Sequence, residues 1–362
     1  MMYWNTCRGN NKKGCSQHPF EQKYMIDYIS ATIQCKYKPN LGNCDFHSAN
    51  IYGFELYHLQ GCSQMKVRWN KDSNILGLFG SLPYFLKGHN FTSSATETAT
   101  AIDLIDRLLG GVGLWGASLN EVECGFILPV GSIKPKMFIQ SHQARKGSGL
   151  KLREDERDAG RLRKWADDGE ELKMYDAKAN LKRKVNLKQR EAIVMGGYNP
   201  EQEYLKLETH ISKPHILSGG RDFLVEHLVN PKWLDVLSNH LKNDYQRLEA
   251  MKTLELPTDK KSLTSADILL HTLANVVMNV EGKPLSDVKK RIYKDINSLP
   301  DTLLDRASKD ARKRQISALF AKVRESNTSQ WDLTDKLNEA IGAEVEESQS
   351  AIRENIDAIA EV

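Results

Sequence analysis

Short segments rich in β-branched and aromatic residues, separated by turn residues, run from Met25 to about residue 213, and they constrain the fold more than any other feature. They read IYGFELYHL, MKVRW, NILGLFGSL, VECGFILPV, KMFIQS and YLKLETHIS. Segments of this length and composition predict β-strands. A helix is expected among them in ATETATAIDLIDRLLGG, ending at Gly110 and Gly111. The charged stretch from Arg145 to Glu171 is expected to form a surface helix with flexible flanks. Together these elements predict an α+β fold with a mainly antiparallel sheet.

The pattern changes after residue 220, where apolar residues recur at helical spacing in RDFLVEHLVNPKWLDVLSNHLKNDYQRLEAM and in three later segments. Thr264 and Asp267 resemble a capping box at the start of one of them. We therefore expect an α+β catalytic domain over 25–220 and a helical domain over 221–330. The polar residues 1–24 are expected to be disordered or poorly ordered, and the acidic residues 331–362 to be helical or disordered. Whether translation starts at Met1 or Met25 is open.

Composition excludes several classes of protein. The 362 residues carry a net charge of only +4, so a nucleic-acid surface must come from local clustering of charge. No apolar run approaches the ~18 residues that span a bilayer. The six cysteines form no C-x-x-C pair and follow no secretory leader, which favours free thiols in a bacterial cytoplasm. A zinc site from Cys7, Cys15 and His18 is conceivable, but its spacing matches no common zinc pattern.

Two of the expected strands bring carboxylates to one surface. Alternation along YLKLETHI separates its apolar side chains from Glu208 and His210, and alternation along NEVECGFIL separates its apolar side chains from Glu121 and Glu123. If both strands lie in one sheet with their apolar sides together, Glu123, Glu208 and His210 converge. Two carboxylates and a histidine form a site for a hard cation such as Mg²⁺ or Mn²⁺. The alternative is that these positions simply face solvent on half-exposed strands.

A tyrosine precedes a basic run in LKMYDAKANLKRK. Between residues 173 and 190 there are seven positive side chains and one negative one. By default Tyr175 is a packing residue and the basic run a solvated helix face. In combination with a divalent cation, however, the Tyr175 hydroxyl can attack a phosphodiester while nearby cations hold the DNA backbone. The DNA-binding candidates are Lys173, Lys182, Arg183, Lys184, Lys188 and Arg190.

The order of several motifs resembles the gene II/gene X replication initiator family of filamentous phages and related plasmids, which includes initiators from phages of the cholera-toxin type. The similar segments are MIDYISATI, GSLPYFLKGHN, NEVECGF, LKMYDAK and YLKLETHISK, within residues 25–220. The resemblance implies a nicking and joining enzyme, related in chemistry to the HUH endonucleases. Such an enzyme starts rolling-circle replication by cutting one strand at a double-strand origin.

Carried over by position, the resemblance makes Tyr175 the nucleophile that forms a 5′-phosphotyrosine link and frees a 3′-OH. Glu123 and Glu208 become metal-ligand candidates, joined by His210, with Mg²⁺ or Mn²⁺ as cofactor. Lys178 would neutralise phosphate or assist proton transfer. The resemblance also implies origin DNA as substrate, with a host helicase and DNA polymerase acting downstream in the bacterial cytoplasm.

Accessory positions and departures from the family pattern complete the expectation. His89 and Asn90, in G-H-N, orient a ligand or stabilise a turn. Glu121 and His210 each stand where the family usually has arginine, and Lys178 lies one residue later than in members with Y-x-K. These departures affect the ligand set rather than the fold.

Two other functions stay open on the sequence alone. One is a non-enzymatic origin-binding or regulatory protein with the same fold, whose DNA binding depends on salt but not on metal. The other is a structural or interaction protein of a mobile element, with no DNA affinity at moderate salt.

Overall fold

The computed structural model describes residues 25–50, 52–91, 93–154, 161–184, 193, 198–250, 254–255, 264–281, 285–322, 324–325 and 331–342. Its main feature is a ten-stranded sheet of order β2-β3-β4-β5-β1-β6-β11-β10-β9-β8, in which every neighbouring pair is antiparallel. The strands are β1 (Met25–Gln34), β2 (Cys44–Ala49), β3 (Phe54–Leu59), β4 (Cys62–Asn70), β5 (Ile75–Ser81), β6 (Ser118–Pro129), β8 (Lys151–Glu154), β9 (Leu162–Ala166), β10 (Glu170–Asp176) and β11 (Tyr204–Ile211). The predicted α+β class is confirmed.

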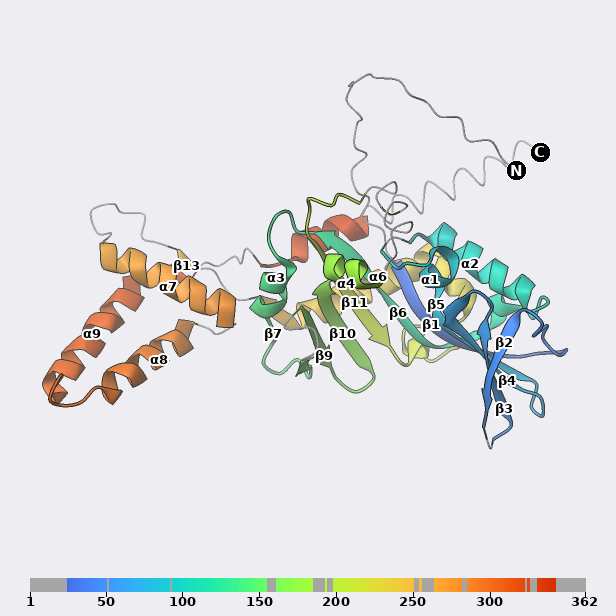
Figure 1. Cartoon of the computed structure of the whole chain (residues 1–362), viewed down its shortest axis with the longest axis horizontal. Helices are drawn as coiled ribbons and strands as arrows, with labels where there is room; N and C mark the ends of the chain where they lie inside the picture. Colours follow the sequence, from blue (N-terminus) through green and yellow to red (C-terminus); the bar gives the residue numbers. More distant parts are fainter. Residues whose placement is uncertain are drawn as a thin grey trace, which may run out of the picture.

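Helices and short elements complete the described chain (Figure 1). The helices are α1 (Leu82–Lys87), α2 (Ala95–Leu108), α3 (Pro135–Ser141), α4 (Ala177–Lys184), α6 (Pro231–Gln246), α7 (Ser265–Glu281), α8 (Leu285–Ser298) and α9 (Arg306–Lys322), with 3-10 turns η1 (Leu114–Gly116), η3 (Pro214–Ile216) and η4 (Val225–Val229). Two small ladders pair β7 (His142–Ala144) with β12 (Leu248–Ala250) and β13 (Leu254–Glu255) with β14 (Arg324–Glu325). None of the described helices is both long and apolar enough to cross a bilayer.

Helix α2 forms where the sequence predicts it, and its start explains why. Ser94 accepts a hydrogen bond from the backbone N–H of Glu97, and the Glu97 carboxylate accepts one from the N–H of Ser94. This capping box satisfies two backbone N–H groups of the first turn. The chain after the helix turns at Gly110 and Gly111, both with positive φ, a conformation that glycine adopts without steric cost.

Two sequence predictions of local structure are wrong. KMFIQS lies in helix α3 rather than in a strand, because Pro135 occupies its first turn with φ preset for a helix and the helix buries Phe138 and Ile139. The stretch 145–171 contains strands β8 and β9 and the start of β10 rather than a surface helix. Trp165 is fully buried in the main core. Burial of this one aromatic side chain favours a strand here, even though the neighbouring residues are highly charged.

Apolar side chains from one face of the sheet form the main core against α2, α3 and α6. This core continues past residue 220, since it includes Phe223, Leu237, Trp331 and Leu337. The boundary expected at 220 therefore does not coincide with the edge of this core, and an independent helical domain over 221–330 stays a prediction. Helices α7, α8 and α9 share a smaller apolar cluster, and α7 contacts α3.

The opposite face of the sheet, which we call the open face, is covered at one end only among the described residues. There Met25, Ile127 and Tyr204 pack with Phe91 and with Leu181 of α4 in a separate apolar cluster. Strands β2, β3 and β4 project from the body as an arm on the side away from α7–α9 (Figure 1). The polar residues predicted to form a site lie on the open face.

Candidate active site

The register of three central strands brings the predicted site residues together. His210 on β11 pairs with Glu123 on β6, and Glu208 on β11 pairs with Lys173 on β10. Antiparallel partners share a face of the sheet, so these four side chains lie on the open face. Strand alternation therefore predicts the location of Glu123, Glu208 and His210 correctly, while their roles stay predictions.

The reading of these positions as solvent-facing is wrong for β11. Glu208 is 2% exposed and Lys206, two residues earlier on the same face, is 1% exposed. Both faces of this strand are buried, one in the apolar core and one in a polar cluster. Buried charges are retained in proteins only when they are paired or coordinate a metal, so the partners of these two side chains decide what the site is.

Lys206 and Asp27 form the centre of the cluster, and sequence reasoning missed both. The Nζ of Lys206 lies 2.7 Å from Oδ2 of Asp27 and also forms an ion pair with Oε1 of Glu208. Ser81 donates a 2.9 Å hydrogen bond to Oδ1 of Asp27, and the Nδ2 of Asn90 donates one of 2.6 Å to Oδ2. The two ends of the segment GSLPYFLKGHN thus orient one carboxylate, which gives Asn90 a defined position in the site.

The third carboxylate, Glu123, lies beside Lys173 and His210. Lys173 forms an ion pair with Oε2 of Glu123, and Nδ1 of His210 lies 3.6 Å from the same oxygen. The other ring nitrogen of His210 lies 3.7 Å from Oε2 of Glu121. His210 therefore bridges two glutamates at the rim of the cluster.

Burial and neighbouring charge shift the pKa values of these groups in opposite directions. Burial raises the pKa of Glu208 well above its usual range, and the nearby carboxylates of Glu123 and Asp27 add to that shift. Burial also disfavours ionised Glu123, but hydrogen bonds and charge from His210 and Lys173 outweigh it and lower the pKa. Burial opposes the charged form of Lys206 as well, yet its two carboxylate partners raise the pKa. Two ammonium groups thus face three carboxyl groups, and Glu208 is the one whose pKa is raised.

Tyr175 joins this cluster from β10. Its hydroxyl donates a 2.9 Å hydrogen bond to Oε1 of Glu208. Burial, followed by the charges of Glu208 and Asp27, raises the pKa of Tyr175 well above that of a free phenol. The hydroxyl is therefore protonated at neutral pH, and its reaction as a nucleophile requires a base. Glu208 is in hydrogen-bonding contact to act as one.

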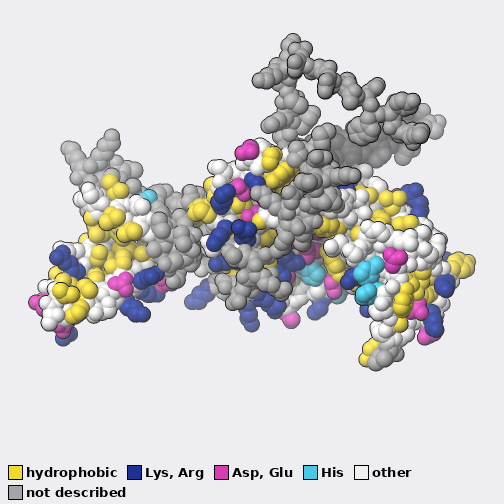
Figure 2. All heavy atoms as spheres, viewed as in Figure 1, with side chains coloured by type: hydrophobic (Ala, Val, Ile, Leu, Met, Phe, Trp, Pro, Cys, Tyr) yellow, Lys and Arg dark blue, Asp and Glu magenta, His cyan; other side chains and the backbone are white. Residues whose placement is uncertain are grey.

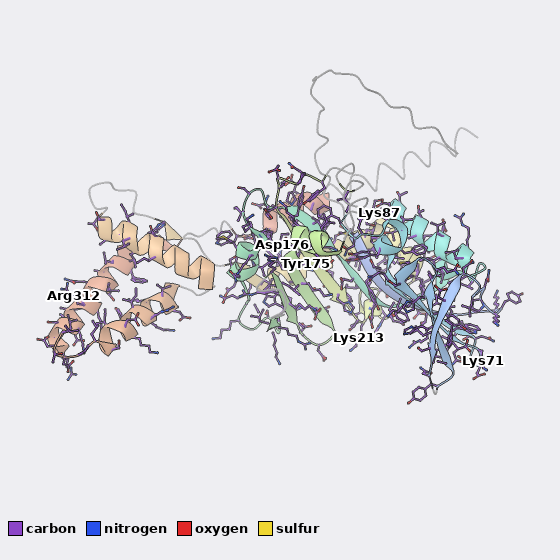
Figure 3. The ribbon with its side chains drawn as sticks, viewed as in Figure 1. Lys71, Lys87, Tyr175, Asp176, Lys213 and Arg312 are labelled. Atoms are coloured by element: carbon purple, nitrogen blue, oxygen red, sulfur yellow. The ribbon has the colours of Figure 1, made fainter. Side chains whose placement is uncertain are left out.

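A cavity of about 700 Å³ opens over these residues. It extends across the sheet from Gln64 on β4 to Lys164 on β9, with Tyr175 and Asp176 in its wall. Figure 3 shows Tyr175 and Asp176 over the middle of the sheet body, far from Lys71 on the arm and Arg312 in the helical region.

Lys178 and His89 lie beside this cavity and not in its wall. Lys178 donates hydrogen bonds of 2.7 Å to Pro200 O and 3.2 Å to Gln202 O, and lines an adjoining hollow of about 690 Å³. His89 is buried in the turn after α1, where its Nδ1 accepts a 3.4 Å hydrogen bond from the N–H of Phe91. Burial, with the charge of Lys87, lowers the pKa of His89 to about 4. These contacts are those of residues that hold backbone segments in place.

The remaining predicted residues are placed as follows. Lys182, Arg183 and Lys184 belong to the backbone of α4. Their side chains lie outside what the structure describes. Residues outside the description altogether are Lys188, Arg190 and the zinc candidates Cys7, Cys15 and His18.

A hard divalent cation fits the carboxylate cluster. Oxygens of Asp27, Glu123 and Glu208 all lie within 4.8 Å of one another, and carboxylates are the ligands that Mg²⁺ and Mn²⁺ prefer. In the described residues a second trio, Glu170, His240 and Asp244, meets the same distance criterion. Each trio already contains a protein cation: a guanidinium nitrogen of Arg247 lies 3.1 Å from Glu170 and 3.0 Å from Asp244, and Lys206 pairs with Asp27 and Glu208. The trio of Asp27, Glu123 and Glu208 is the one that Tyr175 contacts.

The comparisons with known proteins include a low-level structural similarity. No family model and no curated protein matches the chain. A solved structure described as a rolling circle replication initiator protein from Geobacillus stearothermophilus aligns with 70% of this chain and 96% of its own, at 11% identity and a TM-score of 0.34. A similarity at this level assigns no role to any residue.

Proposed function

We propose that this chain is a metal-dependent DNA strand transferase that nicks one strand with Tyr175 and later rejoins it. The observation that carries the proposal is the 2.9 Å hydrogen bond from the Tyr175 hydroxyl to Glu208, a member of the carboxylate trio. A nucleophile, its base and a set of metal ligands are thereby in contact. These are the groups that metal-assisted phosphodiester transfer to a tyrosine uses.

In the chemical step one phosphorus–oxygen bond forms and another breaks. The Tyr175 oxygen attacks the phosphorus of a DNA phosphodiester, and its proton passes to Oε1 of Glu208. The bond from phosphorus to the 3′ oxygen breaks, and that oxygen takes a proton from water to become a free 3′-OH. The product is a phosphotyrosine link to the 5′ end, and attack by a 3′-OH reverses the step.

Several residues of the chain support this step from fixed positions. Asp27, Glu123 and Glu208 would hold Mg²⁺ or Mn²⁺, which when bound supplies positive charge to the phosphate oxygens. Ser81 and Asn90 fix the orientation of Asp27. Lys173 forms an ion pair with Glu123 and neutralises it. When a cation takes over that role, the Lys173 ammonium group would be released to contact a phosphate.

The biological setting of the proposal rests on the resemblance to phage gene II/gene X initiators. In that setting the substrate is the origin of a phage, satellite or plasmid, the reaction starts rolling-circle replication, and a host helicase and polymerase extend the 3′-OH. The ordered motifs between residues 25 and 220 are the support for this assignment.

The experiment that tests the proposal uses the purified full chain and a supercoiled plasmid that carries the origin of the same genetic element. We expect a nicked product and a protein–DNA adduct on a denaturing gel when Mg²⁺ or Mn²⁺ is present. Mass spectrometry should map the adduct to Tyr175. Origin DNA that is bound but never cut with either metal overturns the proposal.

A second candidate function is non-catalytic origin binding with the same fold. One observation favours it: Lys206 and Lys173 already contact all three carboxylates, so the cluster is stable as an ion network without metal. This candidate predicts that a chelator leaves every activity unchanged. The strand-transferase proposal predicts that a chelator stops cleavage and leaves most DNA binding intact.

A further inference from the structure

Two groups of cationic side chains lie on the open face, one on each side of the carboxylate cluster. On β4, Gln64, Lys66 and Arg68 alternate with the buried Met65 and Val67. The register carries that face across the sheet, because Lys66 pairs with Phe79 on β5, Phe79 with Ser30 on β1, and Ser30 with Glu121 on β6. Lys66 and Arg68 therefore share a face with the proposed nucleophile.

The second group lies on the other side of the site. Lys173 on β10 pairs with Lys164 on β9, and Lys164 pairs with Arg153 on β8. Lys151, two residues before Arg153, has the same orientation, and both are exposed. Figure 2 shows Lys and Arg side chains gathered along the lower margin of the sheet body, beside strands β9 and β10. The acidic centre of the open face is thus bordered by positive charge in both directions across the strands.

Rings on which bases can stack lie beside the first group and between the two groups. Arg68 lies over the ring of Phe54, 4.6 Å from its centre, and its side chain passes over Gly77 of β5. Phe79 and Tyr28 are half-buried on the same face, and Tyr28 lines the cavity. Phosphate-binding cations combined with accessible aromatic rings form the usual surface for a single nucleic-acid strand. A duplex needs paired phosphate contacts but no exposed rings.

We propose that a single DNA strand crosses the open face perpendicular to the β-strands, held by Lys66 and Arg68 on one side of Tyr175 and by Lys151, Arg153 and Lys164 on the other. This inference rests on the proposed function, since it assigns the path of the strand that Tyr175 cuts. It names residues outside the catalytic cluster, so it can fail while the cleavage chemistry stands.

The sheet geometry sets the length of the strand. Tyr175 on β10 is five strand steps from β4 and two from β8. At ~4.8 Å a step these are about 24 Å and 10 Å. With ~3.4 Å per stacked nucleotide, the path holds about seven nucleotides on the β4 side and about three on the β8 side. The footprint is therefore about ten nucleotides and asymmetric about the cut.

The test is binding of labelled oligothymidylates of 4 to 16 nucleotides to the full-length Tyr175→Phe variant with a chelator present, so that no cleavage occurs. Fluorescence anisotropy should give an affinity that rises with length and levels off near ten nucleotides. The double variant Lys66→Gln/Arg68→Gln should bind about 20-fold more weakly at 0.1 M salt, with the salt slope smaller by about 1.4. In that variant the affinity should level off at a shorter length.

The variant Lys151→Gln/Arg153→Gln should give a similar loss of affinity. The matched control is Lys232→Gln/Lys242→Gln on α6, which packs against the opposite face of the sheet, and it should bind like the parent. Thermal unfolding of each variant confirms that it is folded.

The outcomes separate the two proposals. Equal affinity of the parent and both open-face variants overturns the path, while cleavage by the wild-type chain would still support the strand transferase. Equal losses in the open-face and α6 variants also overturn the path, because any lysine would then serve. If the parent binds no single strand at any length, both proposals fail.

Discussion

Tyr175 and Lys206 face each other in the register of β10 and β11, and the ammonium group of Lys206 lies 5.7 Å from the centre of the Tyr175 ring. The same ammonium group forms ion pairs with Asp27 and Glu208. The tyrosine is therefore held between a fixed cation at its ring and a carboxylate at its hydroxyl. This position distinguishes it from the other tyrosines of the open face.

Replacing Tyr175 by phenylalanine removes the hydroxyl and leaves the ring over Lys206. We expect no covalent adduct and no nicked product, with origin binding within about twofold of wild type, because only the reacting atom is lost. A denaturing gel and a binding titration check the two parts. Tyr28→Phe, in the wall of the same cavity, is the matched control and should still form the adduct. An adduct that persists in Tyr175→Phe and disappears in Tyr28→Phe would reassign the nucleophile.

The pH dependence of cleavage should report Glu208. Its pKa is raised by burial and neighbouring carboxylates, so in the metal-free cluster it is protonated above the usual carboxylate range and cannot accept the phenol proton. Cleavage should increase as pH rises through this raised pKa. As the Mg²⁺ concentration is raised, this rise in the cleavage rate should shift to lower pH, because a bound cation favours the ionised carboxylate.

The variant Glu208→Gln tests that assignment. It should lower the cleavage rate by about 10²- to 10⁴-fold, the usual contribution of a positioned base. Any residual activity should no longer rise with pH through the pKa of Glu208. Glu249→Gln, on β12 and exposed, should keep both the wild-type cleavage rate and its rise with pH. A Glu208→Gln variant that retains the wild-type pH profile would show that another group accepts the proton.

Replacing Lys206 by methionine should destabilise the protein by about 3–5 kcal/mol, since it leaves Asp27 and Glu208 buried without a cation. Mg²⁺ should restore part of this loss and should stabilise the variant more than it stabilises wild type, because binding only to the folded state adds to its stability. Urea unfolding with and without Mg²⁺ measures both effects. Lys232→Met should change stability by under about 0.5 kcal/mol. Equal Mg²⁺ effects in the Lys206→Met variant and wild type would argue against a cation site at these carboxylates.

Gly125 lies opposite Glu208 in the register, and its lack of a side chain lets β11 approach β6. A Cβ at this position would overlap the carbonyl oxygen of Leu207 and lie 2.8 Å from the Cα of Glu208. Gly125→Ala should therefore cost about 1–3 kcal/mol and reduce cleavage by displacing Glu208. Gly116→Ala, where nothing lies within 4 Å of the added carbon, is the control for chemical denaturation. Unchanged stability of Gly125→Ala would mean that β11 moves freely against β6.

Strand alternation sufficed to place Glu123, Glu208 and His210, because it depends only on the order of side chains along two strands and on a shared apolar side. It could not identify Asp27 and Lys206. A lysine at an alternating position looks the same in sequence whether it faces water or is buried, and its partner lies 179 residues away. The burial of Lys206 is set by that partner.

The errors in local structure have a related cause. The apolar run in α3 is too short to show a period, so Pro135 decides it. Strands β8 and β9 are outlying strands of the sheet, and their charged residues Arg153 and Lys164 lie on the open face. From sequence alone such a strand resembles a polar helix, because its partner strands are not known. The partner of β9 is β10, which follows later in the chain.

The 179-residue separation between Asp27 and Lys206 also bears on how the chain emerges from a ribosome. At 5–20 residues per second, roughly 10 to 40 s pass between synthesis of the two residues. During that interval β1 first lacks its neighbour β6, and β6 then lacks its neighbour β11. The proposed nicking site would therefore be complete only when β11 inserts between β6 and β10. A truncated translation product that stops before residue 204 would lack β11, which carries Lys206, Glu208 and His210 of the site.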